Sequence, residues 1–515
     1  MHKLNINLIS VLSALLFSVL YAFLSYSFIS LFTDIVYIII FTLVLTIIYI
    51  NILRKFIFEI FTLEKGRATE MFAYLLMYVV TVSAIIFPFV FEPIIVFELP
   101  ILRYLIIGFA TILLTKYAIF MLLGPWHDIK MRLKHKIYFE DVEYTPLVSV
   151  VIPAWNEGVG IISTIKSVLN STYRNIEIIV INDGSTDNSD ELIHSFLLQH
   201  NSSSNNDVKI RYRYQENTGK GGALNHALSI AKGEIIVSVD ADCIVDKKAI
   251  NEFVKIFKDP SISAAVGNVK IGNRNSAIGI VQYLEFLFSF YFKRADAMLG
   301  SIYIIGGAAG AFRKNIFEKI GGYSETNITE DIELTVRIQD AGMKIEYATE
   351  AFVYTEGASD IKSLKNQRLR WKRGRFQTFY QHLNLFFSTD KRHNKALTWI
   401  IMPLAMLQEV HLLLEIPFLI FLYVYSFMNF DFSSYMAGVM VVGLMFLVQF
   451  LFYDKSTRRL SFVVLAPIGW LLFYVATYVE AWALVKSIES FIFKRDITWQ
   501  KWEREGVGIV NDGVT

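Results

Sequence analysis

The chain has little that would stabilise a secreted or repetitive fold. It contains one cysteine, Cys243, among its 515 residues. No disulfide can form within it, which excludes a disulfide framework and fits a reducing compartment. It also lacks an internal repeat and a long low-complexity tract, which argues against a solenoid or an array of repeats. The formal net charge is only +2, so no overall excess of charge indicates a partner, and we expect no nucleic acid among the partners.

Apolar residues are in excess. They make up 54% of the chain, and the mean hydropathy is +0.44, which is too high for an ordinary soluble enzyme. The excess collects in runs of about twenty residues, the length that crosses a bilayer core. The first run is interpreted as an anchor because it is long, lacks a small-residue cleavage site and is followed at once by further runs. The predicted spans are residues 8–28, 31–52, 71–91, 101–123, 412–427, 435–452 and 462–485.

The segments that flank the amino-terminal spans are alternately basic and acidic. Lys3 precedes the first span and a basic cluster at 130–136 follows the fourth, whereas the loops around Asp34 and at 92–98 carry acid and almost no base. Cytoplasmic loops are enriched in Lys and Arg, so we expect the amino terminus and the large central block to be cytoplasmic. The carboxyl-terminal topology stays open. Residues 396–430 are too long for one straight span, and the sequence allows either an interfacial helix followed by a span or two short spans.

The central block has a different pattern. Short β-branched runs alternate with segments of helical spacing, which predicts a parallel sheet with helices on both faces. In such sheets ligands bind beyond the carboxyl ends of the strands. We therefore expect an amino-terminal transmembrane region of about four helices (1–125), a cytosolic α/β domain (126–390), a second transmembrane region (391–490) and a cytosolic or interfacial tail (491–515). The expected strands are 147–153, 176–183, 208–215 and 234–242, and the expected helices are 159–169, 187–199 and 219–231.

Two further stretches, 278–292 and 376–387, are aromatic and amphipathic. We predict that they form helices lying at the membrane surface. Helices packed into a protein core are the alternative.

Carboxylates end two of the expected strands. Asp183 closes one, and Asp240 and Asp242, spaced by one residue, close another. Such oxygen ligands suit a hard cation such as Mg²⁺ or Mn²⁺, which can neutralise charge on a departing diphosphate. Taken alone, an acidic pair at a strand end is also a common turn or helix cap, so the pattern needs its context.

Three segments supply that context. The glycine-rich stretch 218–225 opens an expected helix whose backbone amides could face an anion, although Lys220 comes too early for a Walker loop. Thr329-Glu330-Asp331 precedes another expected helix, which Thr329 or Asp331 could cap. The stretch Gln367-Arg368-Leu369-Arg370-Trp371 lies in a basic segment, which by itself would also suit anionic lipid.

In this order the motifs resemble the processive, membrane-embedded family 2 glycosyltransferases, the group of cellulose, chitin, hyaluronan and poly-N-acetylglucosamine synthases. The resemblance implies a GT-A domain, with a Rossmann-like nucleotide-binding half and a mostly parallel sheet, inserted between α-helical transmembrane bundles. Gln367, Arg370 and Trp371 match the motif Gln-x-x-Arg-Trp of family members that elongate a polymer. The overall pattern looks nearest to the poly-N-acetylglucosamine synthases.

The resemblance also implies residue roles. Inverting transfer needs a general base for the acceptor hydroxyl, which maps onto Asp331, with Glu330 beside it in the catalytic pair. Trp371 would floor the acceptor site, where its indole face suits a pyranose ring. The metal ligands would be Asp240 and Asp242. Acceptor contacts are also expected at Gly307 and Gly310, in a run of small residues that lets a sugar approach the backbone. The implied donor contacts are Pro153, Asn156, Glu157, Asp183, Lys220, Asp240, Gln367 and Arg370.

We therefore expect a multi-pass enzyme of the inner (cytoplasmic) membrane with a cytoplasmic catalytic domain. It would add sugar from a UDP-sugar, with UDP-N-acetylglucosamine favoured over UDP-glucose, to a growing β-linked exopolysaccharide. Coupling to translocation and a need for accessory membrane or export subunits stay open. The alternative is a non-processive transferase that glycosylates a lipid or a polyprenyl phosphate, which need not share Gln367, Arg370 and Trp371. A scaffold or sensor with an inactive domain is disfavoured by the intact carboxylates at Asp240, Asp242 and Asp331.

Overall fold

The structure is a computed structural model that describes residues 120, 123–124, 126–139, 142–202, 208–273, 276–429, 460–493, 506, 509–510 and 513–514. The chain divides into two compact units, residues 1–122 with 424–467 and residues 123–423 with 468–515. The second unit holds the α/β domain and is the one described below. The predicted spans 8–28, 31–52, 71–91 and 435–452 lie outside the described residues, as does almost all of 101–123.

An eight-stranded sheet organises the second unit, in the order β3-β2-β1-β4-β7-β6-β8-β5. The first four of these are parallel, β7 runs antiparallel to both β4 and β6, and β6 and β8 are parallel. The sheet is therefore mostly parallel, as predicted, with an antiparallel strand at its centre that the sequence pattern did not indicate. The strands are β1 Val148–Ala154, β2 Ile176–Asp183, β3 Lys209–Gln215, β4 Ile235–Ser238, β5 Ile244–Val245, β6 Ile262–Ile271, β7 Gly310–Arg313 and β8 Lys344–Thr355.

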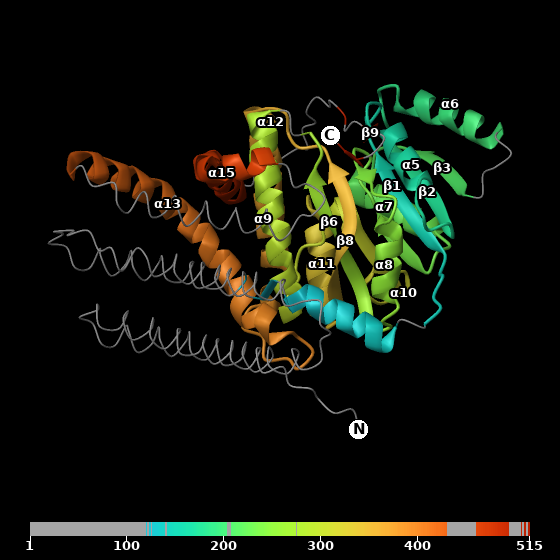
Figure 1. Cartoon of the computed structure of the whole chain (residues 1–515), viewed down its shortest axis with the longest axis horizontal. Coiled ribbons are helices and arrows are strands. Elements are labelled where there is room, and N and C mark those ends of the chain that lie inside the picture. Colours follow the sequence, from blue (N-terminus) through green and yellow to red (C-terminus); the bar gives the residue numbers. More distant parts are fainter. Residues whose placement is uncertain are drawn as a thin grey trace. The chain divides into compact units, whose positions relative to one another are not determined.

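Helices follow most of the strands. α7 packs against β1 and β2, whereas α8 and α9 pack against β6 and β8 (Figure 1). The central strands β1 and β2 are buried along their whole length, which explains why they form continuous apolar runs and do not alternate. The helices are α5 Ile161–Leu169, α6 Ser189–Ser202, α7 Gly219–Ile230, α8 Ala249–Phe257, α9 Ala277–Leu299, α10 Asn315–Ile320, α11 Glu330–Asp340, α12 Ile361–Gln381, α13 Met402–Asn429 and α15 Leu460–Ile492, with short helical turns at Gly307–Ala309, Leu383–Leu385 and Leu397–Ile401.

The expected strands and helices of the nucleotide-binding half are confirmed to within a few residues, with one correction. Strand β4 ends at Ser238, four residues before the predicted end at Asp242. Asp240 and Asp242 therefore lie on the turn after the strand, where their side chains are not fixed by pairing with a neighbouring strand.

Two predictions on the carboxyl-terminal side need correction. The stretch 376–387 does not form a helix of its own, because it covers the end of α12 and the turn Leu383–Leu385. The stretch 396–430 was expected to contain two segments, but after the π-helical turn Leu397–Ile401 it continues as the single helix α13 with Pro417 inside it. The stretch 278–292 lies in α9, which buries Tyr283, Leu284 and Leu287. Among the described residues, the helical segment Leu397–Pro417 is long and apolar enough to cross a membrane.

Candidate active site

Asp183 stands at the carboxyl end of β2 and fixes the turn that leads into α7. Its Oδ1 accepts hydrogen bonds from Gln215 Nε2 at 2.7 Å and from the backbone N–H of Thr218 at 2.9 Å. Thr218 is the N-cap residue of α7, and Lys220 lies in the first turn of that helix. The carboxylate of Asp183 therefore helps to set where Lys220 begins its reach across the site.

Asn156 connects two turns at the same edge of the sheet. Its φ of 54° lies in the left-handed region, which asparagine tolerates better than most residues. Its Oδ1 accepts hydrogen bonds from the backbone N–H groups of Thr186 at 2.6 Å and Asp187 at 3.2 Å. The turn after β1 and the turn after β2 are thus held together, with Glu157 buried beside Asn156 and Pro153 buried in β1.

A candidate cation site lies on the turn after β4. One ligand atom from each of Asp240, Asp242 and Cys243 falls within 4.8 Å of the others. Burial raises the pKa of the Cys243 thiol, and the two carboxylates raise it further. Carboxylate oxygens are the ligands that Mg²⁺ and Mn²⁺ prefer, so Asp240 and Asp242 fit a hard divalent cation.

Lys220 joins this pair to the acids at the start of α11. Its Nζ lies 2.6 Å from Asp240 Oδ1 and 3.1 Å from Glu330 Oε1. Burial by itself would lower the pKa of Lys220, but the carboxylates of Asp240, Glu330 and Asp331 outweigh it and raise the pKa well above its usual value. The side chain is therefore a permanent cation among three carboxyl groups.

Gly307 brings the backbone of the opposite loop into this group. Its N–H donates to Asp331 Oδ2 at 2.9 Å. A Cβ at this position would lie 2.4 Å from Lys220 Nζ and 3.3 Å from Asp240 Oδ1, so a larger residue would displace the lysine ammonium from its place beside Asp240. We call the five residues Lys220, Asp240, Gly307, Glu330 and Asp331 the carboxylate cluster.

Asp331 has an unusual proton affinity for a carboxyl group. Burial raises its pKa to about 6, the neighbouring carboxylate of Glu330 adds to this, and Lys220 together with the backbone N–H groups of Ile332 and Gly307 opposes it. A carboxylate with a pKa near the working pH is well suited to accept a proton during a reaction. Of the two predicted caps of α11, Asp331 accepts from the N–H of Ile332. The Thr329 side chain makes no capping bond to the helix, and its hydroxyl donates to Asn327 Oδ1.

Helix α12 carries the Gln-x-x-Arg-Trp residues and packs closely against the start of α11. A Cβ added at Gly374 would lie 2.1 Å from Thr329 Oγ1, so the two helices meet at a position that has no side chain on α12. Gln367 is buried, and Arg370 and Trp371 are half-buried. The indole ring of Trp371 lies 6.4 Å from the ring of Phe286, and the guanidinium of Arg368 lies 4.3 Å from the indole centroid.

Not all of the predicted residues join the carboxylate cluster. Gly310 lies in β7, where a Cβ would meet the side chains of Phe312 at 2.9 Å and Ile305 at 3.0 Å. Its free side therefore faces the core, and an acceptor role for Gly310 stays a prediction. The donor contacts of Gln367 and Arg370 and the acceptor contact of Trp371 also stay predictions.

Sequence reasoning missed two groups that position the site. Gly374 interrupts a helix of good helix formers, and an isolated glycine of this kind often marks close packing, so a signal for it was present. Gln215 and Thr218, which hold Asp183, had no sequence signal, because their partner lies more than thirty residues away in the chain.

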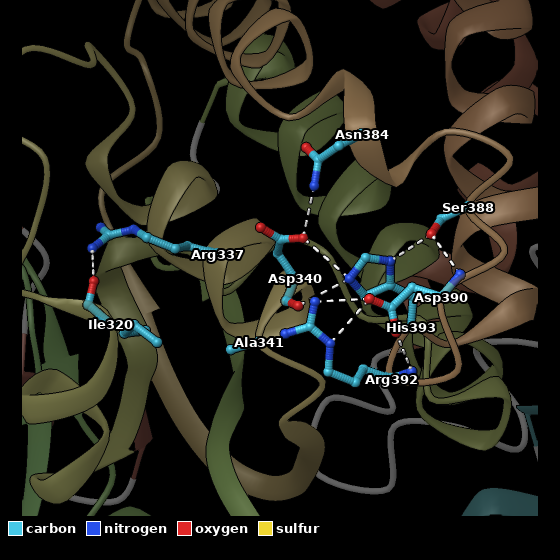
Figure 2. A pocket seen from close by; sticks show the side chains of 9 residues that line it. All are labelled: Ile320, Arg337, Asp340, Ala341, Asn384, Ser388, Asp390, Arg392 and His393. Atoms are coloured by element: carbon cyan, nitrogen blue, oxygen red, sulfur yellow. Dashed lines mark hydrogen bonds and ion pairs between the residues drawn. The ribbon is translucent and has the colours of Figure 1, made fainter.

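A pocket of about 470 Å³ lies elsewhere, at the carboxyl end of α11 (Figure 2). Its polar groups are paired with one another: Asp340 accepts from Asn384 at 2.9 Å, His393 Nε2 lies 3.2 Å from Asp340 Oδ1, and Arg392 donates to Asp390 at 2.7 Å. None of the predicted site residues lines it. The pocket therefore reflects how the loop after α12 attaches to α11, and it lies at the opposite end of that helix from the carboxylate cluster.

The chain is similar to several known proteins. The family described as Glycosyl transferase family 2 matches residues 149–321. A poly-beta-1,6-N-acetyl-D-glucosamine synthase of Staphylococcus epidermidis is 29% identical over 365 residues, which cover 69% of this chain and 84% of that protein. The synthase of the same name from Staphylococcus aureus strain COL is 33% identical over 246 residues, covering 47% and 57%. A solved mannosyltransferase of Pyrobaculum calidifontis, in complex with GDP-Man and Mn²⁺, has a TM-score of 0.46 and 19% identity, covering 74% of this chain and all of that one.

Proposed function

Because the chain belongs to family 2 of the glycosyltransferases, we propose that it is an inverting, processive synthase that extends a β-linked polysaccharide from a UDP-sugar. The observation that supports this proposal most is the carboxylate cluster. In it Lys220 pairs with Asp240 and Glu330, and the backbone N–H of Gly307 holds Asp331. UDP-N-acetylglucosamine is the favoured donor, since the relatives are named poly-beta-1,6-N-acetyl-D-glucosamine synthases; UDP-glucose is the alternative.

The donor is bound by the two joined turns and the start of α7. Pro153, Asn156, Glu157 and Asp183 receive the uridine at the carboxyl ends of β1 and β2, which is where ligands bind in sheets of this kind. Lys220 faces the diphosphate, and Gln367 and Arg370 approach it from α12. The flexible four-carbon stem of Lys220 lets its ammonium turn from Asp240 and Glu330 to the diphosphate.

Asp240 and Asp242 would hold a divalent cation, Mg²⁺ or Mn²⁺, whose charge would neutralise the negative charge that develops on the departing UDP. The residues themselves hold the site open: Gly307 offers no side chain that would fill it, and the turn after β4 presents both carboxylates to one side.

Asp331 accepts the proton of the attacking acceptor hydroxyl as the new glycosidic bond forms and UDP leaves. Two backbone N–H groups fix its carboxylate, from Gly307 at 2.9 Å and from Ile332 at 2.8 Å. Burial raises the pKa of Asp331, and the adjacent carboxylate of Glu330 raises it further. Attack from the face opposite to the leaving diphosphate inverts the anomeric configuration.

The acceptor end of the polymer rests on Trp371, whose indole face stacks against a sugar ring. We further propose that the protein crosses the cytoplasmic membrane several times and that this domain lies in the cytoplasm. Support for that placement comes from the seven apolar runs of the sequence and from the apolar helical segment Leu397–Pro417.

The test uses purified full-length protein in lipid with Mg²⁺ or Mn²⁺. Radiolabelled UDP-N-acetylglucosamine and UDP-glucose are offered in parallel, and the products are separated by size. We expect a polymer of high molecular weight from UDP-N-acetylglucosamine. Label that appears only in a small, lipid-soluble product would contradict the proposal and support a single transfer to a lipid or a polyprenyl phosphate.

A further inference from the structure

Helix α12 presents a second charged face that the proposed reaction does not use. Arg368, Lys372 and Arg375 are spaced by four and three residues, so they lie on one side of the helix. Acids from three other helices face them: Glu285 of α9, Glu409 of α13 and Glu480 of α15. Three cations and three acids therefore form one balanced set, which we call the α12 ion network.

The distances show that the network is closely connected. Arg368 lies 2.7 Å from Glu285 and 3.2 Å from Glu480, and Lys372 lies 2.9 Å from Glu480 and 2.7 Å from Glu409. Arg375 lies 3.2 Å from Glu409. Arg368 and Lys372 are only 3% and 5% exposed. At such burial each ion needs its partner, because an unpaired charge away from water is costly.

Two of the acids stand in strongly apolar helices. Glu409 lies within the candidate span Leu397–Pro417, and Glu480 lies within the sequence-predicted span 462–485. An ionisable residue in such a helix has a high free-energy cost, and it usually pairs with another group and serves a function. Here the partners of both acids are on the helix that carries Gln367, Arg370 and Trp371.

Arg368 connects this network to the predicted acceptor floor. Its guanidinium lies over the indole of Trp371, 4.3 Å from the ring centroid, while its nitrogen atoms contact Glu285 and Glu480. A planar guanidinium held by two carboxylates has a fixed orientation, and it therefore fixes the plane of the ring on which it stacks.

We propose that Glu480 and Glu285 are positioning residues for elongation, and that they act through Arg368 on the orientation of Trp371. The inference rests on the proposed function, because it requires Trp371 to meet the polymer. Helices α9 and α15 then determine how long the acceptor stays bound between transfers, and the donor site is unaffected.

The test compares Glu480→Gln, Glu285→Gln and Arg368→Lys with the parent, as full-length protein in lipid. The matched control is Glu489→Gln, which lies on the same helix as Glu480 but pairs locally with Lys486 at 2.7 Å. Product length, UDP release and UDP affinity are measured together. We expect the three variants to give products about threefold to tenfold shorter, as the loss of one oriented cation–π contact would produce, with UDP affinity and the control unchanged.

A second comparison separates positioning from a general structural effect. In a Trp371→Ala background, Glu480→Gln should shorten the product no further, because residues that act through one another are not additive. An equal further shortening would overturn the inference, as would normal product length in both Glu480→Gln and Arg368→Lys, or a parallel loss of UDP affinity and product length. If Glu480→Gln does not fold, Arg368→Lys decides the question. A parent protein that makes no polymer from either donor refutes the proposed function itself.

Discussion

At the scale of single residues, the proposed chemistry depends most on Asp331. Replacing it by asparagine keeps the shape but removes the proton acceptor. We expect Asp331→Asn to lower kcat by at least about a hundredfold, the usual contribution of a general base, while UDP affinity stays within about twofold because the donor contacts are elsewhere. Steady-state turnover and calorimetric UDP binding measure the two effects. Near-normal turnover in this variant would show that another group is the base.

The pH dependence follows from the same residue. The pKa of Asp331 is raised to about 6, so the carboxylate takes up a proton as the pH falls through that value and then cannot act as a base. We expect kcat/KM to be level above about pH 7 and to fall tenfold per pH unit well below about pH 6. Rates measured between pH 5 and pH 8 at constant ionic strength test this. A profile that stays flat through pH 6 would contradict the assignment of Asp331 as the base.

Trp371 is expected to act on the polymer and not on the donor. Trp371→Ala removes the stacking surface, so elongation should fall by up to about tenfold, because an aromatic contact is worth about 0.5–1.5 kcal/mol. Hydrolysis of the UDP-sugar without an acceptor should change much less. The measurement is the ratio of polymer formed to UDP released. Equal loss of both activities would count against the role of Trp371 as acceptor floor.

At the scale of elements, the packing of α12 on α11 is the most specific feature. Helix propensity alone predicts that Gly374→Ala stabilises an exposed helix by about 1 kcal/mol. The close approach to Thr329 predicts that the same substitution destabilises the protein, since overpacking costs about 1–3 kcal/mol. We therefore expect a lower unfolding temperature and weaker turnover.

Thermal unfolding and UDP release check this variant, with Lys362→Ala as the control at an exposed position in the first turn of the same helix. That control should behave like the parent. A rise in the unfolding temperature of Gly374→Ala would mean that the two helices do not meet as described.

An element could be predicted from the sequence when the residue pattern within it and at its ends was enough to mark it. Strands β1 and β2 are fully buried, so their apolar runs and the turn residues after them mark both ends. Strand β4 was predicted too long, because Val239 and Ala241 are apolar and buried yet belong to the turn that carries Asp240 and Asp242. The antiparallel strand β7 is only four residues long and follows a glycine run, which hides its pattern.

The candidate site divides in the same way. The motif residues were predicted by resemblance, and the structure brings Lys220, Asp240, Glu330, Asp331 and Gly307 together. The partners of Arg368 could not be predicted, because Glu285 and Glu480 are 83 and 112 residues away in the chain. From the sequence alone, a basic segment such as this one is predicted to be a surface helix, because the acids that neutralise it are distant in the chain.

At the scale of the whole molecule, the central claim is that one active site adds many sugars before the polymer leaves. The α/β domain supplies the transfer chemistry, and the apolar helices that contact α12 through Glu409 and Glu480 connect this chemistry to the predicted membrane region.

The most direct test is the length of the product at low conversion, made by the purified protein in lipid with acceptor ends in large excess over enzyme. We predict that a few long chains appear at once while most acceptor ends stay unextended. If all ends instead lengthen together by one or a few sugars, the enzyme releases its product after each transfer, and the claim of processive synthesis is wrong.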